Sequence, residues 1–431
     1  MTIEQLKQRA CEAVDKNREK IISIGKSILR EPEMGYKEFK TAQKVKEVFD
    51  ELGYSYVDQQ AITGVIATAS GKEHKAKIAV MGELDAVMVP NHPFADKVTN
   101  AAHACGHNVQ IATMLGTAIA LKESGVMEEL DGDVALMAVP SEEGVELEYR
   151  NGLIKEGKIS FLGGKQEFIK LGLFDDIDAM IMQHTTKGDT VNAGGPGGMG
   201  FIAKLVRYIG KESHGAAPDQ GINALTAARI GLGAVDAIRD TFRDEDGIRW
   251  HPIITKGGDL VNVVPGEVKI ESFVRGYSLE AIKDANFKIN RALKAGADAV
   301  GAQIEINDLP GYTFFHEDLA LKQVVEDNFI QLVGKDHVGV GKGLTTDAND
   351  VSYLIPTVHA YAGGAVGTGH GADYAVENEE LAYIVATKML VMTSIDLLYD
   401  GAKKAIEIKK NFKPVYTKEE YLREWGGLEI K

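Results

Sequence analysis

The sequence predicts an α/β fold in two parts: a domain with a mostly parallel, helix-flanked sheet, and an inserted α+β domain with a four-stranded sheet and two helices. From residue 64 to 184, short apolar runs alternate with helical segments, as in proteins with buried parallel strands. A glycine-rich segment at 192–200 interrupts this pattern. Beyond it, the spacing of apolar residues predicts a largely antiparallel sheet with helices on one face.

The first part contains three apolar runs of strand length, each ending in acidic residues or a histidine, at residues 76–84, 133–144 and 178–185. Open α/β sheets bind their ligands beyond the carboxyl ends of the strands. We therefore expect the functional residues to follow these three runs. The chain returns to a mixed α/β pattern after the inserted part, with helices expected near 319–333 and 379–399.

The second part has four strand-like segments and two helical ones, at residues 200–211, 222–242 (helix), 251–258, 267–277, 279–297 (helix) and 302–308. We place the domain boundaries accordingly. The first domain is expected to span residues 1–193 and 317–431, and the inserted domain residues 194–316.

Composition excludes several classes of function. The 431 residues carry a formal net charge of -15, and no basic patch is visible, which argues against nucleic acid or an anionic membrane as partner. No segment approaches the roughly 20 uninterrupted apolar residues of a membrane span, and the N-terminus resembles an amphipathic helix more than an export signal. With Cys11 and Cys105 as the two cysteines, a disulfide framework is not expected, and a reducing cytoplasm fits.

The segment HACGHN at 103–108 is the first candidate site. Cys105 and His107 stand two residues apart at the start of a helix, where the helix dipole helps to keep the thiol ionised, and both are good zinc ligands. Small loop residues of this kind often serve packing alone. A cysteine nucleophile paired with a histidine is the other chemical interpretation.

Three further clusters follow predicted strands or lie in glycine-rich loops. Glu142 and Glu143 come directly after a buried strand, so that one could bind a metal ion while the other holds a water and moves its proton. An exposed acidic loop is the alternative, and the buried strand before the pair argues against it. His184 follows the next strand, and His370 lies among five glycines between 363 and 371. A single histidine is usually structural, but four such clusters together are hard to explain by packing.

The motifs HACGHN, PSEEG, QH, GKESHGAAP, GGDLVNVVP and GTGH occur in this order over nearly the whole chain. As a set they resemble the di-zinc amidohydrolases of the aminoacylase and carboxypeptidase G superfamily. The segment GLTTDANDVSYLIPTVHAY is similar to the branch that holds the p-aminobenzoyl-glutamate hydrolases and the β-alanyl dipeptidases. The resemblance implies a zinc-peptidase-like catalytic domain with an inserted lid or dimerisation domain.

The resemblance also implies a role for each matching residue. Two divalent ions, expected to be zinc with manganese or cobalt as alternatives, would be bound by Cys105, His107, Glu143, His184 and His370. Glu142 would be the general base, and Asp85 would orient a ligand. His214 would support the oxyanion from the lid domain, often that of a partner subunit, while Asn262 and Arg275 would bind the substrate carboxylate.

The sequence departs from the family pattern at three places. Asn108 stands where many relatives have Asp, and Glu83 where distant relatives have a metal-binding His, so the metal count is left open. Residues 145–162 form an insertion relative to shorter relatives, directly after the paired glutamates. Because the insertion follows the catalytic pair, it could shape the substrate pocket.

We therefore expect a homodimeric, metal-dependent amidohydrolase that cleaves an N-acyl, aminobenzoyl or aminoacyl amino acid with a free carboxylate. Metal-activated water would attack the amide carbonyl, with Glu142 as the base and then the acid. A metal-free hydrolase with Cys105 as nucleophile is one alternative, but it leaves the other clusters unexplained. A binding protein on an inactive scaffold is the second, and the presence of every residue that the mechanism needs argues against it.

Overall fold

The computed structural model describes residues 1–426 and divides the chain into two compact units. The first unit contains Met1–Val145, Gly163–Gly197 and Phe315–Glu420. The second contains Glu146–Leu162, Gly198–Phe314 and, of the described residues, 421–426. The functional domains at 1–193 with 317–431 and at 194–316 stay a prediction.

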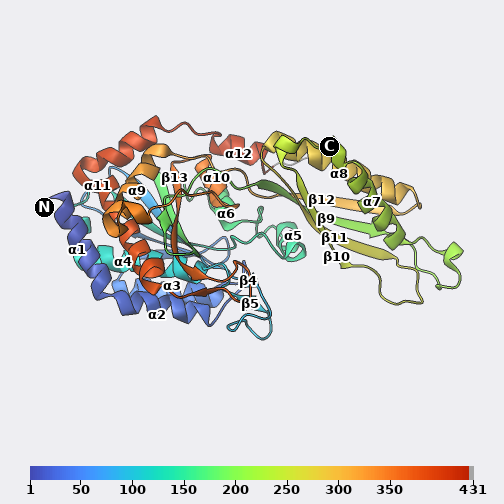
Figure 1. Ribbon diagram of the computed structural model, residues 1–431, viewed down its shortest axis with the longest axis horizontal. Coiled ribbons are helices and arrows are strands. Elements are labelled where there is room, and N and C mark those ends of the chain that lie inside the picture. Colours follow the sequence, from blue (N-terminus) through green and yellow to red (C-terminus); the bar gives the residue numbers. More distant parts are fainter. Residues whose placement is uncertain (427–431) are drawn as a thin grey trace. The chain divides into compact units, whose positions relative to one another are not determined.

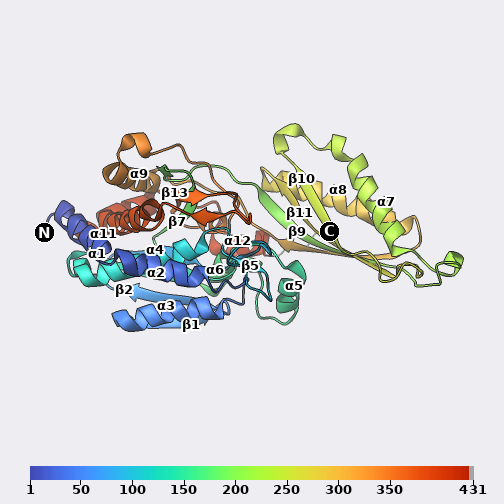
Figure 2. The same cartoon turned by 60° about the horizontal axis from the view of Figure 1, so that its bottom comes forward.

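The first unit is built on an eight-stranded sheet in the order β1-β2-β6-β3-β7-β13-β14, with β8 paired to β13. The strands are β1 (Tyr56–Gln60), β2 (Gly64–Ala69), β3 (Lys77–Glu83), β6 (Asp133–Val139), β7 (Ala179–Lys187), β8 (Val191–Asn192), β13 (Thr357–Val366) and β14 (Ala375–Val376). The central strands β6, β3, β7 and β13 run parallel, and the outer pairs are antiparallel. The predicted parallel core is therefore confirmed, and the carboxyl ends of its strands meet at one edge (Figures 1 and 2).

Helices cover this sheet: α1 (Ile3–Lys16), α2 (Arg18–Leu29), α3 (Phe39–Leu52), α4 (His107–Ser124), α6 (Gly164–Leu171), α9 (Leu319–Val333), α10 (Ala348–Ser352) and α11 (Ala386–Asn411). Helix α4 lies against β2, β3, β6 and β7, and α1, α2 and α11 pack on α4 (Figure 2). Because α4 is enclosed in this way, it is buried on nearly all sides, which explains its apolar sequence.

The helical segment Glu380–Asn411 is the one part of the described chain that is long and apolar enough to cross a membrane. Within its most apolar window, 89% of the residues are buried inside the structure. Its apolar side chains join the core of the first unit, together with residues of α1, α4 and α9.

The second unit contains the four-stranded antiparallel sheet β10-β11-β9-β12, as predicted. Its strands are β9 (Gly200–Ile209), β10 (Arg249–Lys256), β11 (Glu267–Gly276) and β12 (Gln303–Pro310), and its two long helices are α7 (Ala224–Ala237) and α8 (Leu279–Asp298). Alternate residues of β11 are buried, as expected for a sheet with helices on one face (Figure 1). Gly296 lets α7 and α8 approach closely, since a Cβ there would lie 2.4 Å from the Gly231 amide nitrogen.

Residues 146–162 belong to the second unit by their contacts, whereas the boundaries expected from the sequence include them in the first domain. The reason lies in packing. Leu147 and Leu162 share a buried cluster with Phe201 and Tyr312, and helix α5 (Leu147–Lys155) lies between them in sequence. Near the end of the described chain, the Trp425 indole donates a hydrogen bond to the Gly311 carbonyl oxygen at 2.9 Å.

Candidate active site

The ends of three parallel strands bring the predicted site residues of the first unit together. Asp85 follows β3, Glu142 and Glu143 follow β6, and His184 lies within β7. These strands are neighbours in the order β6-β3-β7, so their carboxyl ends are adjacent. The loop before α4 adds Cys105, and α4 itself begins at His107.

All five predicted metal ligands lie in two clusters that share one residue. Cys105, His107 and His184 form one cluster and Cys105, Glu143 and His370 the other, and in each the ligand atoms lie within 4.8 Å of one another. Cys105 Sγ is 3.3 Å from His184 Nε2, and Glu143 Oε1 is 3.1 Å from His370 Nε2. The arrangement therefore places two potential ion positions side by side, joined by a thiol.

The donor set fits divalent metal ions. Thiolate, imidazole and carboxylate are the ligands that zinc takes in proteins, and mixed sets of this kind also accept other first-row metals. Burial by itself raises the pKa of the Cys105 thiol, but His107 and His184 outweigh it and hold that pKa well below its usual value. A thiolate is the form that binds a metal ion.

Asp85 is fully buried and contacts two of the predicted ligands. Its Oδ2 accepts a hydrogen bond from the Glu143 backbone N–H at 2.9 Å. His107 Nδ1 lies 2.9 Å from the Asp85 carbonyl oxygen and 3.2 Å from its Oδ1. A proton on Nδ1 satisfies both oxygens, which leaves the lone pair of His107 on Nε2, the atom that faces the cluster.

Glu142 is buried beside these clusters, with Oε2 3.9 Å from His107 Nε2. Burial, followed by the nearby charges of Glu83 and Glu143, raises the pKa of the Glu142 carboxyl well above its ordinary value. The preceding Ser141 has a φ of 56°, a left-handed conformation that is uncommon outside glycine, and its backbone N–H donates to Glu38 at 2.8 Å. A carboxyl with a raised pKa, held by a fixed turn, suits a group that accepts and returns a proton.

Three predicted site residues lie in the second unit. His214 and Asn262 are exposed neighbours, since His214 bridges to Val263 and the Gly215 N–H donates to the Asn262 carbonyl at 2.7 Å. The Arg275 guanidinium lies elsewhere in this unit, over the rings of Phe201 and Phe273 at 5.2 and 5.1 Å. Within the second unit, the structure thus brings His214 and Asn262 together.

Several residues that the sequence analysis did not assign lie at this site. Glu83 is 3.1 Å from His107 Nε2 and forms an ion pair with the fully buried Lys165. The His359 ring lies 5.8 Å from that of His184, and its Nδ1 is 3.2 Å from the Tyr361 hydroxyl oxygen. Glu83 could have been found from its place at the end of β3. Lys165 carries no such signal, because lysine is almost always a surface residue.

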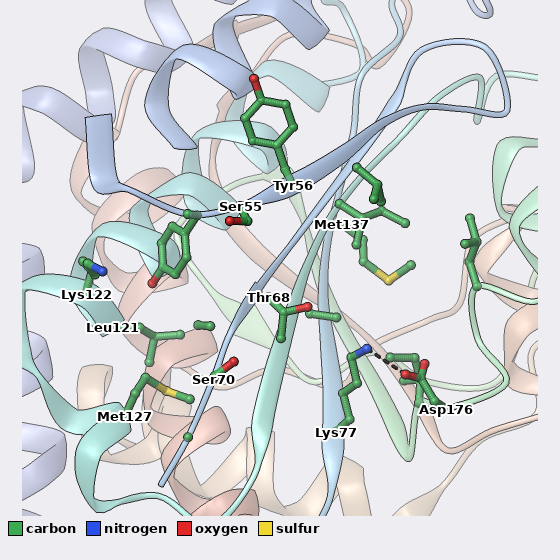
Figure 3. A pocket seen from close by; sticks show the side chains of 18 of the residues that line it. Ser55, Tyr56, Thr68, Ser70, Lys77, Leu121, Lys122, Met127, Met137 and Asp176 are labelled. Atoms are coloured by element: carbon green, nitrogen blue, oxygen red, sulfur yellow. Dashed lines mark hydrogen bonds and ion pairs between the residues drawn. The ribbon is translucent and has the colours of Figure 1, made fainter. Parts of the chain in front are cut away.

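A separate groove of about 1230 Å³ contains none of the predicted site residues. It lies along β1 and β2 at the edge of the sheet, and its lining includes Tyr56, Thr68 and Met137 (Figure 3). The Lys77 ammonium is paired there with Asp176 at 2.7 Å. The predicted site residues therefore lie outside this groove.

Comparison with known proteins decides the family. Residues 79–393 match the family described as Peptidase family M20/M25/M40, which is most of the chain. The chain belongs to this family. As a member it is a hydrolase of amide or peptide bonds, and the resemblance stated from the motifs is confirmed.

The relatives are similar over most of their length. The chain is 26% identical to the Xaa-Arg dipeptidase of Homo sapiens over 424 residues, covering 92% of this chain and 90% of that protein. It is also 26% identical to the N-acyl-L-amino acid amidohydrolase of Geobacillus stearothermophilus, over 72% of this chain and 80% of that protein. Among solved structures, an aminobenzoyl-glutamate utilization protein from Klebsiella pneumoniae has a TM-score of 0.68 at 18% identity, covering 90% of this chain and 99% of that one. That likeness concerns the fold alone.

Proposed function

We propose that this chain hydrolyses the amide bond of a dipeptide or N-acyl amino acid that carries a free carboxylate, using two divalent metal ions. The ions are taken to be zinc, with manganese and cobalt as the alternatives to test. The observation that carries the proposal is the pair of ligand clusters that share Cys105, next to the buried Glu142. Cys105, His107, Glu143, His184 and His370 would hold the ions.

The residues divide the chemistry among them. When bound, the two ions would supply Lewis acidity, which lowers the pKa of water and polarises the amide carbonyl. Glu142 accepts a proton from the attacking water at a carboxylate oxygen and then gives that proton to the leaving nitrogen. Asp85 holds the His107 ring and the Glu143 backbone in place through its hydrogen bonds. His214, from the lid domain of this chain or of a partner subunit, supports the developing oxyanion.

The substrate class rests on two supports. The names of the relatives include a dipeptidase and an N-acyl amino acid amidohydrolase, and p-aminobenzoyl-glutamate belongs to the same chemical class of amides. The second unit offers Asn262 and Arg275 for a carboxylate, and a planar guanidinium matches a carboxylate better than an ammonium does. Because both cysteines are free, we also propose the reducing cytoplasm as the place of action.

A cysteine-nucleophile hydrolase is a second candidate, which one observation favours. Cys105 Sγ and His184 Nε2 are 3.3 Å apart, as in a nucleophile with its base. The two candidates respond differently to removal of metal. A cysteine hydrolase keeps its activity in a chelator and loses it on thiol alkylation, whereas the two-metal enzyme loses its activity in the chelator.

The experiment is a substrate panel with defined metal. Protein freed of metal by a chelator is assayed on p-aminobenzoyl-glutamate, N-acetyl and N-benzoyl amino acids and β-alanyl dipeptides, with zinc, manganese or cobalt added back. We expect no turnover without metal and recovery as two ions bind per chain. Full activity of the metal-free protein, or none on any of these amides with metal, would contradict the proposed function.

A further inference from the structure

Three charged side chains form a buried network beside the candidate site. Lys165 Nζ lies 2.5 Å from Glu83 Oε1 and also contacts Asp347 Oδ1. The Lys165 backbone N–H donates to the other oxygen of Asp347 at 2.9 Å. All three side chains are at most 1% exposed. Asp347 thus binds both the ammonium and the backbone of Lys165, which fixes the ammonium against Glu83.

Glu83 also belongs to a third group of potential metal ligands. Glu83, His107 and Glu142 have ligand atoms within 4.8 Å of one another, and all three are buried. Glu83 Oε2 is 3.1 Å from His107 Nε2, and Glu142 Oε2 is 3.9 Å from the same nitrogen. Two carboxylates and an imidazole at such distances are a typical binding site for a divalent cation.

An ion in this third group would compete with the proposed chemistry. It would use an oxygen of Glu142, which the proposed mechanism needs for the proton of water. It would also draw His107 away from the cluster with Cys105. A hydrolase with these residues therefore needs a means to keep its third ligand group free of metal.

We propose that the buried ammonium of Lys165 excludes a divalent ion from the Glu83, His107 and Glu142 group, and so reserves Glu142 for proton transfer. Lys165 already neutralises Glu83 and occupies its Oε1, while the Gln110 side-chain amide donates to Oε2 at 2.5 Å. A second cation close to a fixed ammonium is repelled, and most strongly where water is excluded. The inference rests on the proposed two-metal function, because it concerns which sites those ions avoid.

Lys204 provides a matched control for the structural role of a buried lysine. It is also fully buried, and it pairs with Asp308 and, at 2.5 Å, with Asn290. None of these partners belongs to the ligand groups found among residues 1–426. Lys204→Met therefore removes a buried cation at comparable cost to folding without opening a metal site.

The test is the number of ions bound per chain. Metal-free wild type, Lys165→Met, Lys204→Met and the double variant Lys165→Met/Glu83→Gln are dialysed to equilibrium against excess Zn²⁺, and bound metal is measured by elemental analysis. We expect about two ions in wild type, Lys204→Met and the double variant, and about three in Lys165→Met. Turnover of Lys165→Met should fall at least tenfold as Zn²⁺ rises above two equivalents, while that of Lys204→Met stays level.

A second variant covers the case in which Lys165→Met does not fold. In Lys165→Met, both Glu83 and Asp347 lose their buried cation, whereas in Lys165→Met/Asp347→Asn only Glu83 does. The double variant keeps the third ligand group complete, so it should also bind about three ions. Two ions in both Lys165→Met and Lys165→Met/Asp347→Asn would overturn the inference while leaving the two-metal function intact. Fewer than two ions in wild type would overturn the proposed function itself, and this inference with it.

Discussion

Adjacent glutamates illustrate how surroundings assign roles to identical side chains. Glu142 faces His107 at 3.9 Å, and burial together with Glu83 raises its pKa. Glu143 instead faces His370 at 3.1 Å, and its backbone is bound by Asp85. The surroundings of Glu142 favour a group that carries a proton. Those of Glu143 favour a metal ligand that acts together with Cys105 and His370. Both roles are what the family resemblance implies, and they stay predictions.

Arg275 allows a test of carboxylate recognition. Arg275→Lys keeps the charge but removes the planar fork and its contact with Phe201 and Phe273. We expect kcat/KM to fall roughly 10- to 100-fold on free-acid substrates and little on their methyl esters. Arg207→Lys, an exposed arginine on the same sheet that is paired with Glu267, should leave both unchanged. Equal losses on acids and esters in Arg275→Lys would show a structural role.

His103 predicts how acid affects the stability of the metal-free protein. Burial, and then the charge of His107, lowers the pKa of His103 to about 3, against an ordinary value of 6.5. Between pH 6.5 and 3 the unfolded chain therefore binds a proton at this residue that the folded chain does not. The contribution of His103 to the free energy of unfolding is therefore fully present above pH 6.5 and is lost as the pH falls. At pH 5 the loss is about 2 kcal/mol.

His103→Phe removes this titration and keeps a ring of similar size. Its free energy of unfolding, relative to wild type, should thus improve by about 2 kcal/mol between pH 7.5 and pH 5. Denaturant titrations of both metal-free proteins at the two pH values measure the change. A difference that does not vary with pH would mean that His103 has the same pKa in the folded and the unfolded chain, and would contradict this prediction.

At the scale of elements, helix α6 fixes the loop that carries the paired glutamates. A Cβ at Gly164 would lie 1.9 Å from the Pro140 carbonyl oxygen, and the Gly164 N–H donates to the Ser141 carbonyl at 3.2 Å. The start of α6 therefore rests directly on the backbone before Glu142. Only a glycine permits this approach.

Gly164→Ala should consequently push this loop out of place. We expect a loss of about 1–3 kcal/mol of stability, as for other overpacked sites, together with weaker metal binding. Gly152→Ala is the control, because a Cβ at this position of α5 meets nothing within 4 Å. Thermal unfolding and metal titration of the two variants provide the comparison. If Gly164→Ala matched Gly152→Ala in both stability and metal binding, the claim that α6 fixes this loop would be contradicted.

Much of the element pattern could be read from the sequence, and the exceptions have physical causes. The parallel strands were visible because their apolar runs end in polar residues at the ligand-binding edge. The packing of residues 146–162 is not visible in the sequence, because a local pattern cannot show that Leu147 shares a buried cluster with Phe201 and Tyr312. Lys165 was missed for a similar reason, since its partners Glu83 and Asp347 lie 82 and 182 residues away.

At the scale of the whole molecule, we predict a homodimer formed through the inserted domain. The edge strand β10 exposes Ile253 and Ile254, and an unpaired edge with apolar side chains favours pairing about a two-fold axis. His214 also lies in this domain, and a dimer would allow it to serve the neighbouring site. Sedimentation at assay concentration should therefore show a dimer, and a fully active monomer would contradict the prediction.

A charged side chain introduced on the edge strand β10 tests whether the dimer forms through this strand. Ile254→Glu should weaken the dimer and lower turnover with it, because burying an unpaired carboxylate at an interface is costly. Val57→Glu is the matched control, since Val57 is similarly exposed on the edge strand β1 of the first unit. It should sediment and turn over like wild type.

The most direct test of the two-metal mechanism compares Glu142→Gln with Glu143→Ala. Metal content by elemental analysis and the turnover rate are measured for both. Glu142→Gln should keep two ions and lose roughly 10²–10⁴-fold in turnover, because an amide cannot accept the proton of water. Glu143→Ala should lose metal, and excess zinc should restore part of its activity. Loss of metal from Glu142→Gln with retention in Glu143→Ala would reverse the two roles, and full activity of both would contradict the mechanism.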